Sequence, residues 1–272
     1  QGDSIVMHTK DGMNVLFDGG STSKKNVGRY TIYTYLKYCG VRSLDYVFIS
    51  HPDKDHVNGI YELIELCDNT FEIGTVVLPG IRRTTAVKKQ DCDDLSKLER
   101  TLKTAGINVV YADAGDCIRS GEFSVKCMHP CEGYDYESAN DYSAVYLVEY
   151  GDFSMLMTGD AEKKAEKCII KDANRMAGDA GESARLVSVN ILKVGHHGSK
   201  GASSEEFLSY VKPENALISC GAGNSYGHPH TETLQRLSEI GAKVYRTDES
   251  GEIAVRVRDG SYKIEVFRAL KR

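Results

Sequence analysis

Apolar residues follow two patterns along the chain: short runs typical of strands, and longer stretches at helical spacing. The short runs predict strands at residues 4–8, 14–17, 44–49, 75–78, 109–111, 123–128, 143–150, 153–157, 187–194 and 216–220, and a closing hairpin at 252–267. The helical spacing predicts helices at residues 27–39, 60–66, 162–174, 203–211 and 231–240, and one carrying Leu95, Leu98 and Leu102. Strands and helices therefore interleave along the whole chain.

Turn and capping residues separate these elements. Gly151-Asp152 and Asp259-Gly260 each predict a hairpin turn, and Ser203 with Glu206 has the spacing of a capping box at a helix start. The two halves of the chain are similar in make-up, with no proline-rich or low-complexity linker between them. The pattern indicates one α/β domain over residues 1–272, and a four-layer αββα sandwich fits the order of its elements.

The composition is that of an ordinary soluble globular protein. Of 272 residues, 41% are hydrophobic and 27% are charged, and the net charge is −5 with a pI of about 5.9. The whole molecule is therefore not drawn to a polyanion, and any nucleic-acid contact needs a local basic patch. The candidate basic clusters are Lys24, Lys25 and Arg29, and then Arg82, Arg83, Lys88 and Lys89. We interpret them as solvated surface charges, with a phosphate-guiding rim as the alternative.

The eight cysteines form no C-x-x-C pair, which argues against a zinc ribbon and against a small disulfide scaffold. We expect most of them to be reduced and buried, whereas an exported protein could form disulfides, with Cys127 and Cys131 closest in sequence. No run of about 18 apolar residues is present to span a membrane, and residues 1–10 lack the apolar core of a signal peptide. The chain opens abruptly on Gln1, so we expect that residues upstream were removed. A cytoplasmic and an exported location are both open.

Four side chains of metal-ligand type stand close together directly after the predicted strand at residues 44–49. They are His51, Asp53, Asp55 and His56. On a loop, ligands at positions i, i+2 and i+4 can bend around one centre, while the residue at i+5 can reach a second. Carboxylate oxygens mixed with imidazole nitrogens suit zinc, manganese or iron. The alternative is a polar turn in which Asp53 and Asp55 cap the following helix.

Two further motifs stand at the ends of predicted strands. Met157-Thr158-Gly159-Asp160 places a carboxylate where it could bridge two cations, although Gly-Asp is also a common turn sequence. Lys193-Val194-Gly195-His196-His197-Gly198-Ser199 delivers twin histidines to a glycine turn. Because adjacent side chains leave a strand in opposite directions, we expect one histidine to bind metal and the other to contact substrate. We favour His197 as the ligand and His196 as the substrate contact.

The remaining histidines differ in their sequence context. His228 follows Asn224-Ser225-Tyr226-Gly227, a polar loop suited to a pocket rim, and is predicted to contact substrate. His230 is predicted to begin a helix. His129, which precedes Pro130 at a strand end, and His8, in an early strand, are interpreted as structural residues.

Taken in order, these motifs resemble the metallo-β-lactamase superfamily and, more narrowly, the hydrolase domain of the ComEC family of DNA-uptake competence proteins. The resemblance spans nearly the entire chain and rests on Gln1-Gly2-Asp3-Ser4, Phe17-Asp18-Gly19-Gly20, residues 50–56, Asn140 with Ser143, Thr158-Gly159-Asp160, His196-His197-Gly198-Ser199 and residues 224–229. Phosphorylcholine esterases of the superfamily look similar in the H-x-D-x-D-H and His-His-Gly-Ser motifs. The spanning helices of the competence proteins are absent from this sequence, so the resemblance does not carry the DNA-uptake role with it.

The sequence departs from the superfamily pattern at two places. The general motif is H-x-H-x-D-H, and Asp53 stands where the second histidine would be, so an oxygen donor replaces a nitrogen. A further histidine of the superfamily is missing from Ala139-Asn140-Asp141-Tyr142-Ser143, where Asn140 or Asp141 would stand in. Both departures bear on the first metal position, which is expected to be harder and less selective for zinc.

The resemblance implies a binuclear hydrolase that binds two divalent ions, Zn or Mn. His51 and Asp53 would hold one ion, Asp55, His56 and one of the twin histidines would hold the other, and Asp160 would bridge them. A hydroxide shared by the ions would then hydrolyse a phosphodiester.

The remaining motif residues receive roles around that centre. We expect Asp55, His196 and His228 to act in catalysis, and Ser199, Asn224 and Asn140 to bind substrate. Asp18 would orient a ligand histidine.

The expected partner is a phosphodiester-containing substrate, with DNA and a phosphorylated small molecule both open, as is the oligomeric state. One alternative is hydrolysis of a lactam, thioester or lactone by the same centre. The other is a non-catalytic metal- or ligand-binding module, which is motivated by the histidine missing near Asn140.

Overall fold

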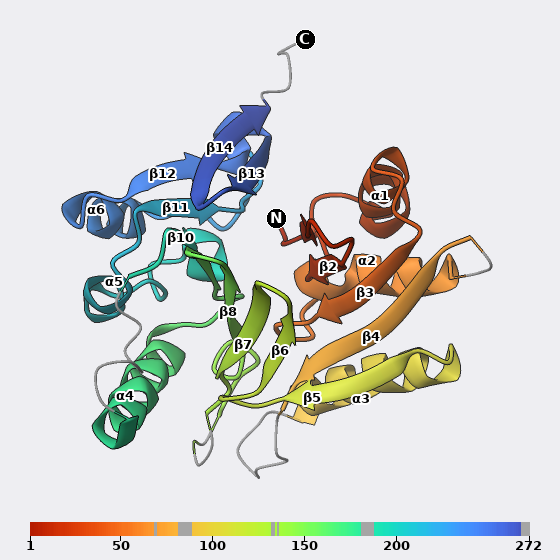
Figure 1. Ribbon diagram of the computed structural model, residues 1–272, viewed down its shortest axis with the longest axis horizontal. Helices are drawn as coiled ribbons and strands as arrows, with labels where there is room; N and C mark the ends of the chain where they lie inside the picture. The colour runs from red at the N-terminus through yellow and green to blue at the C-terminus, as the bar shows by residue number, and fades with distance from the viewer. Residues whose placement is uncertain (68–69, 81–88, 132–133, 135, 181–187, 268–272) are drawn as a thin grey trace. The chain divides into compact units, whose positions relative to one another are not determined.

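The computed structural model describes residues 1–67, 70–80, 89–131, 134, 136–180 and 188–267, and the chain forms two compact units (Figure 1). The first unit comprises Gln1–Asp113 and Asp135–Ala144, and the second comprises Ala114–Tyr134 and Val145–Arg272. The chain therefore passes from the first unit to the second, returns, and ends in the second. That residues 1–272 act as one domain stays a prediction.

The first unit is built on a five-stranded sheet with the order β1-β2-β3-β4-β5. Its strands are β1 (Ile5–His8), β2 (Asn14–Phe17), β3 (Ser43–Phe48), β4 (Glu72–Pro79) and β5 (Asn108–Ala112). β1 and β2 pair antiparallel, whereas the other neighbours pair parallel. Parallel strands need crossover connections, and helices supply those connections here.

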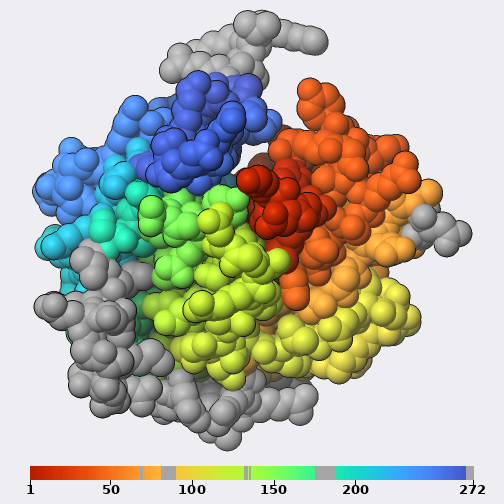
Figure 2. Space-filling model, in the orientation of Figure 1, coloured from red at the N-terminus to blue at the C-terminus, as the bar shows by residue number. Residues whose placement is uncertain are grey.

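The helices of the first unit bury an apolar face against this sheet. A π-helical segment (Gly28–Ile32) leads into α1 (Tyr33–Tyr38), and α2 (Lys54–Glu65) and α3 (Lys89–Thr104) lie side by side (Figure 1). Leu98 and Leu102 of the predicted stripe are fully buried in a core shared with α2 and the strands. In the space-filling view this unit's surface runs without a break from red through orange to yellow (Figure 2).

The second unit is built on a seven-stranded sheet with the order β12-β11-β10-β9-β8-β7-β6. Its strands are β6 (Cys117–Ser120), β7 (Phe123–His129), β8 (Val145–Tyr150), β9 (Phe153–Met157), β10 (Ile191–Lys193), β11 (Asn215–Ile218) and β12 (Lys243–Arg246). From β6 to β9 the neighbours are antiparallel, and from β9 to β12 they are parallel. The parallel half carries the sequence motifs at its strand ends.

Helices α4 (Lys163–Ala180), α5 (Glu205–Val211) and α6 (Thr231–Glu239) form a row along this sheet (Figure 1). Their buried residues, among them Ile169, Phe207 and Leu237, join the core of the unit. A short helix, α7 (Thr247–Ser250), precedes the hairpin of β13 (Glu252–Arg258) and β14 (Ser261–Phe267). Each unit thus provides one helix-covered sheet.

Most predicted elements are present, with differences at short or polar segments. The hairpin turns at Gly151-Asp152 and Asp259-Gly260 are confirmed by the pairs Tyr150↔Phe153 and Arg258↔Ser261. Strands β6 and β12 and helix α7 were not predicted, and β10 is shorter than residues 187–194, of which 187 lies outside the described residues.

The predicted capping box at Ser203 is wrong. α5 is capped one residue later by Ser204, whose hydroxyl accepts from the Phe207 amide, because Ser203 is in the left-handed region with a φ of 53°.

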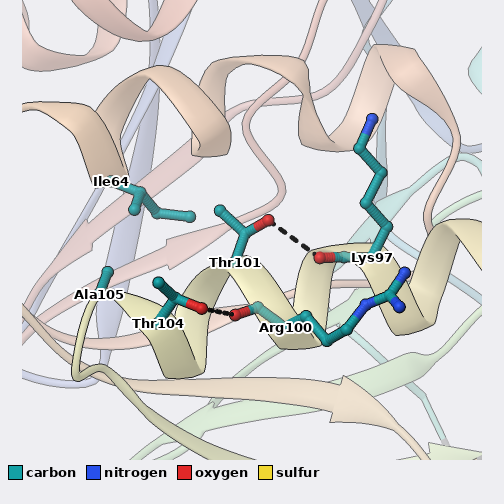
Figure 3. A pocket seen from close by; sticks show the side chains of 6 residues that line it. All are labelled: Ile64, Lys97, Arg100, Thr101, Thr104 and Ala105. Carbon is teal, nitrogen blue, oxygen red and sulfur yellow. Dashed lines mark hydrogen bonds between the residues drawn. The ribbon is translucent and has the colours of Figure 1, made fainter.

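A shallow groove runs along α3 beside α2 (Figure 3). Ile64, Lys97, Arg100, Thr101, Thr104 and Ala105 line it. The Thr101 hydroxyl donates to the Lys97 carbonyl at 2.9 Å and the Thr104 hydroxyl to the Arg100 carbonyl at 2.8 Å. Its hydroxyl groups are thus engaged by the helix backbone, and none of the sequence motifs lines it.

Across the part of the chain that the structure describes, no helix has both the length and the apolar character that crossing a bilayer requires.

Helix α2 approaches the loops of the first unit more closely than any side chain would permit. A Cβ atom on Gly59 would lie 2.4 Å from the Gly19 carbonyl oxygen, and one on Gly28 would lie 2.1 Å from the Gly59 carbonyl oxygen. The start of α2 is thereby held against the loop that follows β2. Glycine is required at this contact because neighbouring backbone atoms occupy the space of a side chain.

We predict that Gly59→Ala lowers the free energy of unfolding by about 1–3 kcal/mol, the usual cost of overpacking. Helix propensity alone would raise it by about 1 kcal/mol, so the sign separates the two effects. Urea denaturation measures the difference. Arg100→Ala on the exposed side of α3 is the control and should change stability by less than about 0.5 kcal/mol. A more stable G59A protein would show that the close contact does not constrain α2.

Candidate metal centre

In the first unit, two parallel neighbours deliver polar residues to the same sheet edge. β2 ends at Phe17 and β3 at Phe48, and these two residues are register partners. Asp18 follows β2, and its carboxylate accepts hydrogen bonds from the Ser50 amide at 2.8 Å and the Ser50 hydroxyl at 2.7 Å. The carboxylate thereby ties the loop after β2 to the start of the H-x-D-x-D-H motif.

The same carboxylate orients His56. Asp18 Oδ2 lies 2.9 Å from His56 Nδ1, and both side chains are buried. A carboxylate only accepts, so Nδ1 carries the proton and Nε2 carries the lone pair. Histidine ligands of metals are commonly held in this tautomer by such a contact. The contact expected from sequence between Asp18 and a motif histidine is present.

The motif does not lie wholly on a loop, as the sequence had suggested. α2 begins at Lys54, so Asp55 and His56 belong to its first turn, and Asp53 is the N-cap residue. Asp53 makes no side-chain capping bond, which removes the simple capping explanation for that carboxylate. The expectation of a loop was wrong for Asp55 and His56 because the apolar pattern that marks the helix starts only after its polar first turn.

His51, Asp53 and His56 are brought close together. The rings of His51 and His56 have centroids 4.2 Å apart, and His51 Nε2 lies 3.6 Å from Asp53 Oδ2. His51 is fully buried, whereas about half of the Asp53 side chain is exposed. The helix N-terminus adds a positive potential that favours the carboxylates in this turn.

Sequence reasoning assigned no role to Asp3, which is a buried member of this group. The Asp3 amide donates to the Asp55 carbonyl at 3.1 Å, and its Oδ2 lies 4.0 Å from His56 Nδ1. Asp3, Asp18 and His56 have the spacing of a metal-binding triad, with ligand atoms within 4.8 Å of one another. A Cβ on Gly2 would lie 2.2 Å from the Gly20 carbonyl oxygen, so only glycine permits this approach. The available signal was the opening motif Gln1-Gly2-Asp3-Ser4.

The segment around Asn140 also reaches the motif. The Ala144 amide donates to the Ser50 carbonyl at 2.8 Å, which places this segment beside the first residue of the motif. The Asp141 carboxylate accepts a hydrogen bond from the Glu137 amide at 3.0 Å and so stabilises the turn in which it lies. Burial raises the pKa of the nearby Tyr142 hydroxyl, and the Asp91 and Asp53 carboxylates add to that rise. Replacement of the missing histidine by Asn140 or Asp141 stays a prediction.

In the second unit, Asp160 and the twin histidines meet by the same principle. β9 and β10 are parallel, with Met157 opposite Lys193, so the residues that follow them lie at one edge. The Thr158 hydroxyl donates to the Lys193 carbonyl at 2.6 Å, and the His196 amide donates to the Gly159 carbonyl at 3.0 Å. These bonds fix the two loops to each other.

Both twin histidines face the same carboxylate. His196 Nε2 lies 3.6 Å from Asp160 Oδ2, and His197 Nε2 lies 3.7 Å from Asp160 Oδ1. Their φ angles are 45° and 52°, a left-handed turn that overrides the alternation expected of a strand. His197 is fully buried, whereas a quarter of the His196 side chain is exposed.

The outer nitrogens of both rings have fixed partners. His197 Nδ1 donates to the Ser219 carbonyl at 2.8 Å, and His196 Nδ1 donates to the Glu162 carboxylate at 2.8 Å. In both rings the lone pair is therefore on Nε2, the atom that faces Asp160. Glu162 was missed by sequence reasoning, and its only signal was its position two residues after Asp160.

The loop that carries His228 brings that ring to the twin histidines. The ring centroids of His228 and His196 are 5.4 Å apart, and those of His228 and His197 are 6.5 Å apart. The pKa of His228 is lowered to about 4, mainly by burial and in smaller part by the neighbouring His196, His230 and His197. His228 is therefore a neutral imidazole at physiological pH.

Asn224 and Ser199, predicted to bind substrate, are engaged within their own loops. The Asn224 amide oxygen accepts from the Tyr226 and His228 amides, and its nitrogen donates to the Gly221 carbonyl at 2.9 Å. The Ser199 hydroxyl accepts from the Gly201 amide at 3.2 Å. Their contact with substrate stays a prediction, and the bonds seen here position His228 and the twin-histidine turn. His230 occupies the N-cap position of α6, as predicted.

The loop after the twin histidines is held by a buried carboxylate and a guanidinium. The Glu166 carboxylate accepts from the Ser203 amide and, at 3.0 Å, from the Ser204 amide. Burial raises the pKa of Glu166 in spite of these bonds. Arg236 donates to the carbonyls of Ser203 and Ala202, each at 2.8 Å, and of Lys200 at 3.1 Å.

The basic clusters are described only in part. Lys24 and Lys25 are exposed, and the Arg29 guanidinium lies 3.5 Å from the Glu65 carboxylate. Arg82, Arg83 and Lys88 lie outside the described residues.

Comparison with known proteins first identifies the fold. The family model of the metallo-β-lactamase superfamily matches residues 1–84, which include the H-x-D-x-D-H motif. The metallo-β-lactamase fold protein YhfI from Bacillus subtilis aligns with a TM-score of 0.53 at 11% identity, covering 90% of this chain and 88% of that one. CmlA, a diiron β-hydroxylase from Streptomyces venezuelae, aligns with a TM-score of 0.54 at 14% identity. The alignment covers 90% of this chain and 53% of CmlA. The predicted α/β metallo-β-lactamase fold is therefore confirmed.

The sequence relatives are competence and recombination proteins. ComE operon protein 3 of Bacillus subtilis is 29% identical over 86% of this chain and 27% of its own length. Recombination protein 2 of Haemophilus influenzae is 28% identical over 95% of this chain and 28% of its own length. Competence protein ComA of Neisseria gonorrhoeae is 27% identical over 100% of this chain and 33% of its own length. The resemblance to competence proteins is confirmed, and the chain spans about a third or less of these relatives.

The donor chemistry of both groups fits divalent cations. Each group combines carboxylate oxygens with imidazoles whose Nε2 carries the lone pair, because Asp18, Glu162 and the Ser219 carbonyl hold the Nδ1 protons. These are the donors that zinc, manganese and iron accept in proteins.

We predict that Arg236→Lys loosens the loop after the twin histidines. One ammonium group cannot reproduce the fork of bonds to three carbonyls, so we expect a loss of about 1–3 kcal/mol in unfolding free energy and faster hydrogen exchange at the amides of residues 200–204. Arg100→Lys, on an exposed helix surface, is the control. Unchanged exchange at Ser203 and Ser204 in R236K would show that Arg236 does not hold this loop.

Proposed function

We propose that this chain is a binuclear metal-dependent phosphodiesterase of the metallo-β-lactamase superfamily. One observation carries most of the proposal: Asp160 stands between the Nε2 atoms of His196 and His197, at 3.6 and 3.7 Å, with both outer nitrogens fixed. A buried carboxylate flanked by two oriented imidazoles is a ligand arrangement, whereas a turn aspartate would need neither histidine. The superfamily is one of hydrolases, which supports the reaction type.

We assign the cations to the two groups of residues as the sequence motifs suggest. His51 and Asp53 would hold one cation, and Asp55, His56 and His197 the other, with Asp160 shared. Bound there, two divalent cations would supply a hydroxide at neutral pH and neutralise charge on a phosphoryl group.

The chain's own side chains would bind and orient the substrate. His196 is the more exposed of the twin histidines, and Glu162 holds its Nδ1 proton, so its Nε2 is suited to accept a hydrogen bond from a water or a substrate hydroxyl. His228 is neutral and lies beside it, so it can donate one N–H to a phosphate oxygen without adding a charge. Asn140 would offer an amide from the segment tied to Ser50.

A phosphodiester fits this site better than a neutral acyl substrate. Asp53 in place of a histidine makes the donor set rich in oxygen, which favours hard cations and phosphoryl oxygens. The names of the relatives, competence and recombination proteins, support DNA as the phosphodiester. A net charge of −5 means that any strand would have to be bound by local basic residues.

We predict two bound divalent cations per chain after purification without chelator, and turnover of bis-p-nitrophenyl phosphate with manganese or zinc. Asp160→Ala should lose the metal pair and at least about 100-fold in kcat/KM, a loss of about 2.7 kcal/mol. Asp152→Ala, at an exposed hairpin turn, is the matched control. A folded protein that binds no metal and shows no turnover would be a binding module instead, and full activity in D160A would exclude Asp160 from the reaction.

The orienting role of Asp18 gives a separate prediction. Asp18→Asn should weaken metal binding about 10- to 100-fold, because an amide has a single acceptor oxygen and cannot accept from both the Ser50 amide and His56 Nδ1 as the two carboxylate oxygens do. Asp45→Asn is the matched control, since Asp45 also accepts a backbone amide, from Asn14 at 2.7 Å, but lies in no histidine group. Chelator competition measures both affinities. Equal affinities in D18N and the parent protein would refute the role.

A further inference from the structure

The second unit holds a group of thiols and an imidazole that the proposed hydrolase chemistry does not use. His129 is the last residue of β7, Cys131 follows it, and Cys168 lies in α4. All three are buried, and one ligand atom from each lies within 4.8 Å of the others. From the sequence, His129 was interpreted as structural, most cysteines were expected to be reduced and buried, and Cys127 and Cys131 were noted as the closest pair in sequence.

We propose that His129, Cys131, Cys168 and Asp172 bind a zinc ion that fastens α4 to the end of β7. This is a thiolate site made of residues other than those assigned to the hydrolase, so it stands or fails independently of the proposed function.

The spacing of the group matches a zinc ion. His129 Nδ1 lies 3.4 Å from Cys131 Sγ. With Zn–N of about 2.0–2.1 Å and Zn–S of about 2.3 Å, nitrogen and sulfur on a tetrahedral ion stand about 3.6 Å apart. Nitrogen and sulfur therefore already have nearly the separation of bound ligands, and Cys168 supplies a third ligand from the facing helix.

We assign the fourth ligand position to Asp172. It lies one helical turn after Cys168, so both side chains leave the same face of α4. The Asp172 carboxylate contacts the Cys131 thiol. Two cysteines, one histidine and one aspartate make a four-coordinate set of accepted zinc ligands.

Metals bind the thiolate form of cysteine, so zinc binding would release the thiol protons of Cys131 and Cys168. Cys127 is differently engaged, because its thiol donates to the His129 carbonyl at 3.0 Å. Because the Cys127 thiol is engaged with the backbone, we assign Cys131 and Cys168 as the sulfur ligands.

Cobalt(II) titration of the full chain tests the site. Thiolate–cobalt bonds give an intense near-ultraviolet charge-transfer band, and the hydrolase residues contain no cysteine, so the band reports on this group alone. We expect one equivalent of cobalt to develop the band, and zinc to abolish it because zinc competes for the same thiolates. Cys168→Ser and Cys131→Ser should lose it.

Cys220→Ser is the matched control, since Cys220 is a buried thiol of the same unit that bonds Asp248 at 3.1 Å. The band should persist in C220S. A protein with all eight thiols titratable after denaturation that gives no band, or a band that survives in C168S, would overturn the proposal. So would purified protein with two fewer thiols and a linked Cys131–Cys168 peptide, which would make the pair a disulfide. The zinc competition uses the parent protein, so the test holds even if a variant fails to fold.

Discussion

Parallel pairing of strands is the constraint on which both groups of candidate ligands depend. β2 pairs with β3, and β9 with β10, so each pair ends at one sheet edge and delivers its following residues together. Asp18 meets the H-x-D-x-D-H motif in this way, and Asp160 meets the twin histidines. The apolar strands fix where the edge lies, and the polar residues after them can then be placed without disturbing the core. Open α/β sheets bind ligands at the carboxyl ends of their strands for the same reason.

Hydrogen bonds to the Nδ1 atom of each imidazole then fix the orientation of the ring and leave the lone pair on Nε2. Asp18 and Glu162 supply carboxylates, and Ser219 supplies a carbonyl, to the Nδ1 atoms of three histidines. A free histidine samples both tautomers and many ring orientations, whereas these are fixed before any cation arrives. Because less ordering is needed on binding, the affinity of such a site rises with the rigidity of its supports. That is why residues remote from the cation, such as Asp18, are expected to matter as much as ligands.

The sequence was sufficient to predict the fold class and most strands because apolar residues alternate with turn residues throughout. It also identified the motifs, since ligand-type residues at strand ends are a local signal. The start of α2 was missed because its first turn is polar, and helical periodicity becomes visible only from Val57 and Ile60 onward. β12 was missed because it is short and none of its residues is fully buried. Local pattern therefore fails where an element is polar or only half buried.

The parts of the site that could not be predicted depend on contacts between remote segments. Asp3 approaches His56 only because Gly2 lets the backbone pass Gly20, and no periodicity encodes that contact. The left-handed turn of His196 and His197 likewise lies against a loop anchored from α4 and α6, so its side-chain directions follow from tertiary structure. Sequence supplied the residue types, and packing decided which atoms face one another.

The second unit carries two donor sets of different softness, the carboxylate and imidazoles around Asp160 and the thiols near His129. Oxygen and imidazole donors around Asp160 suit manganese, zinc or iron, whereas the thiols near His129 favour a softer ion such as zinc. Hard cations gain little from sulfur, so exchange of the metal at the carboxylate group need not disturb the thiol group. The thiol group, packed between β7 and α4, would act on stability, because a metal bound only in the folded state adds its binding free energy to folding. Catalysis and structural integrity would then depend on separate metal sites.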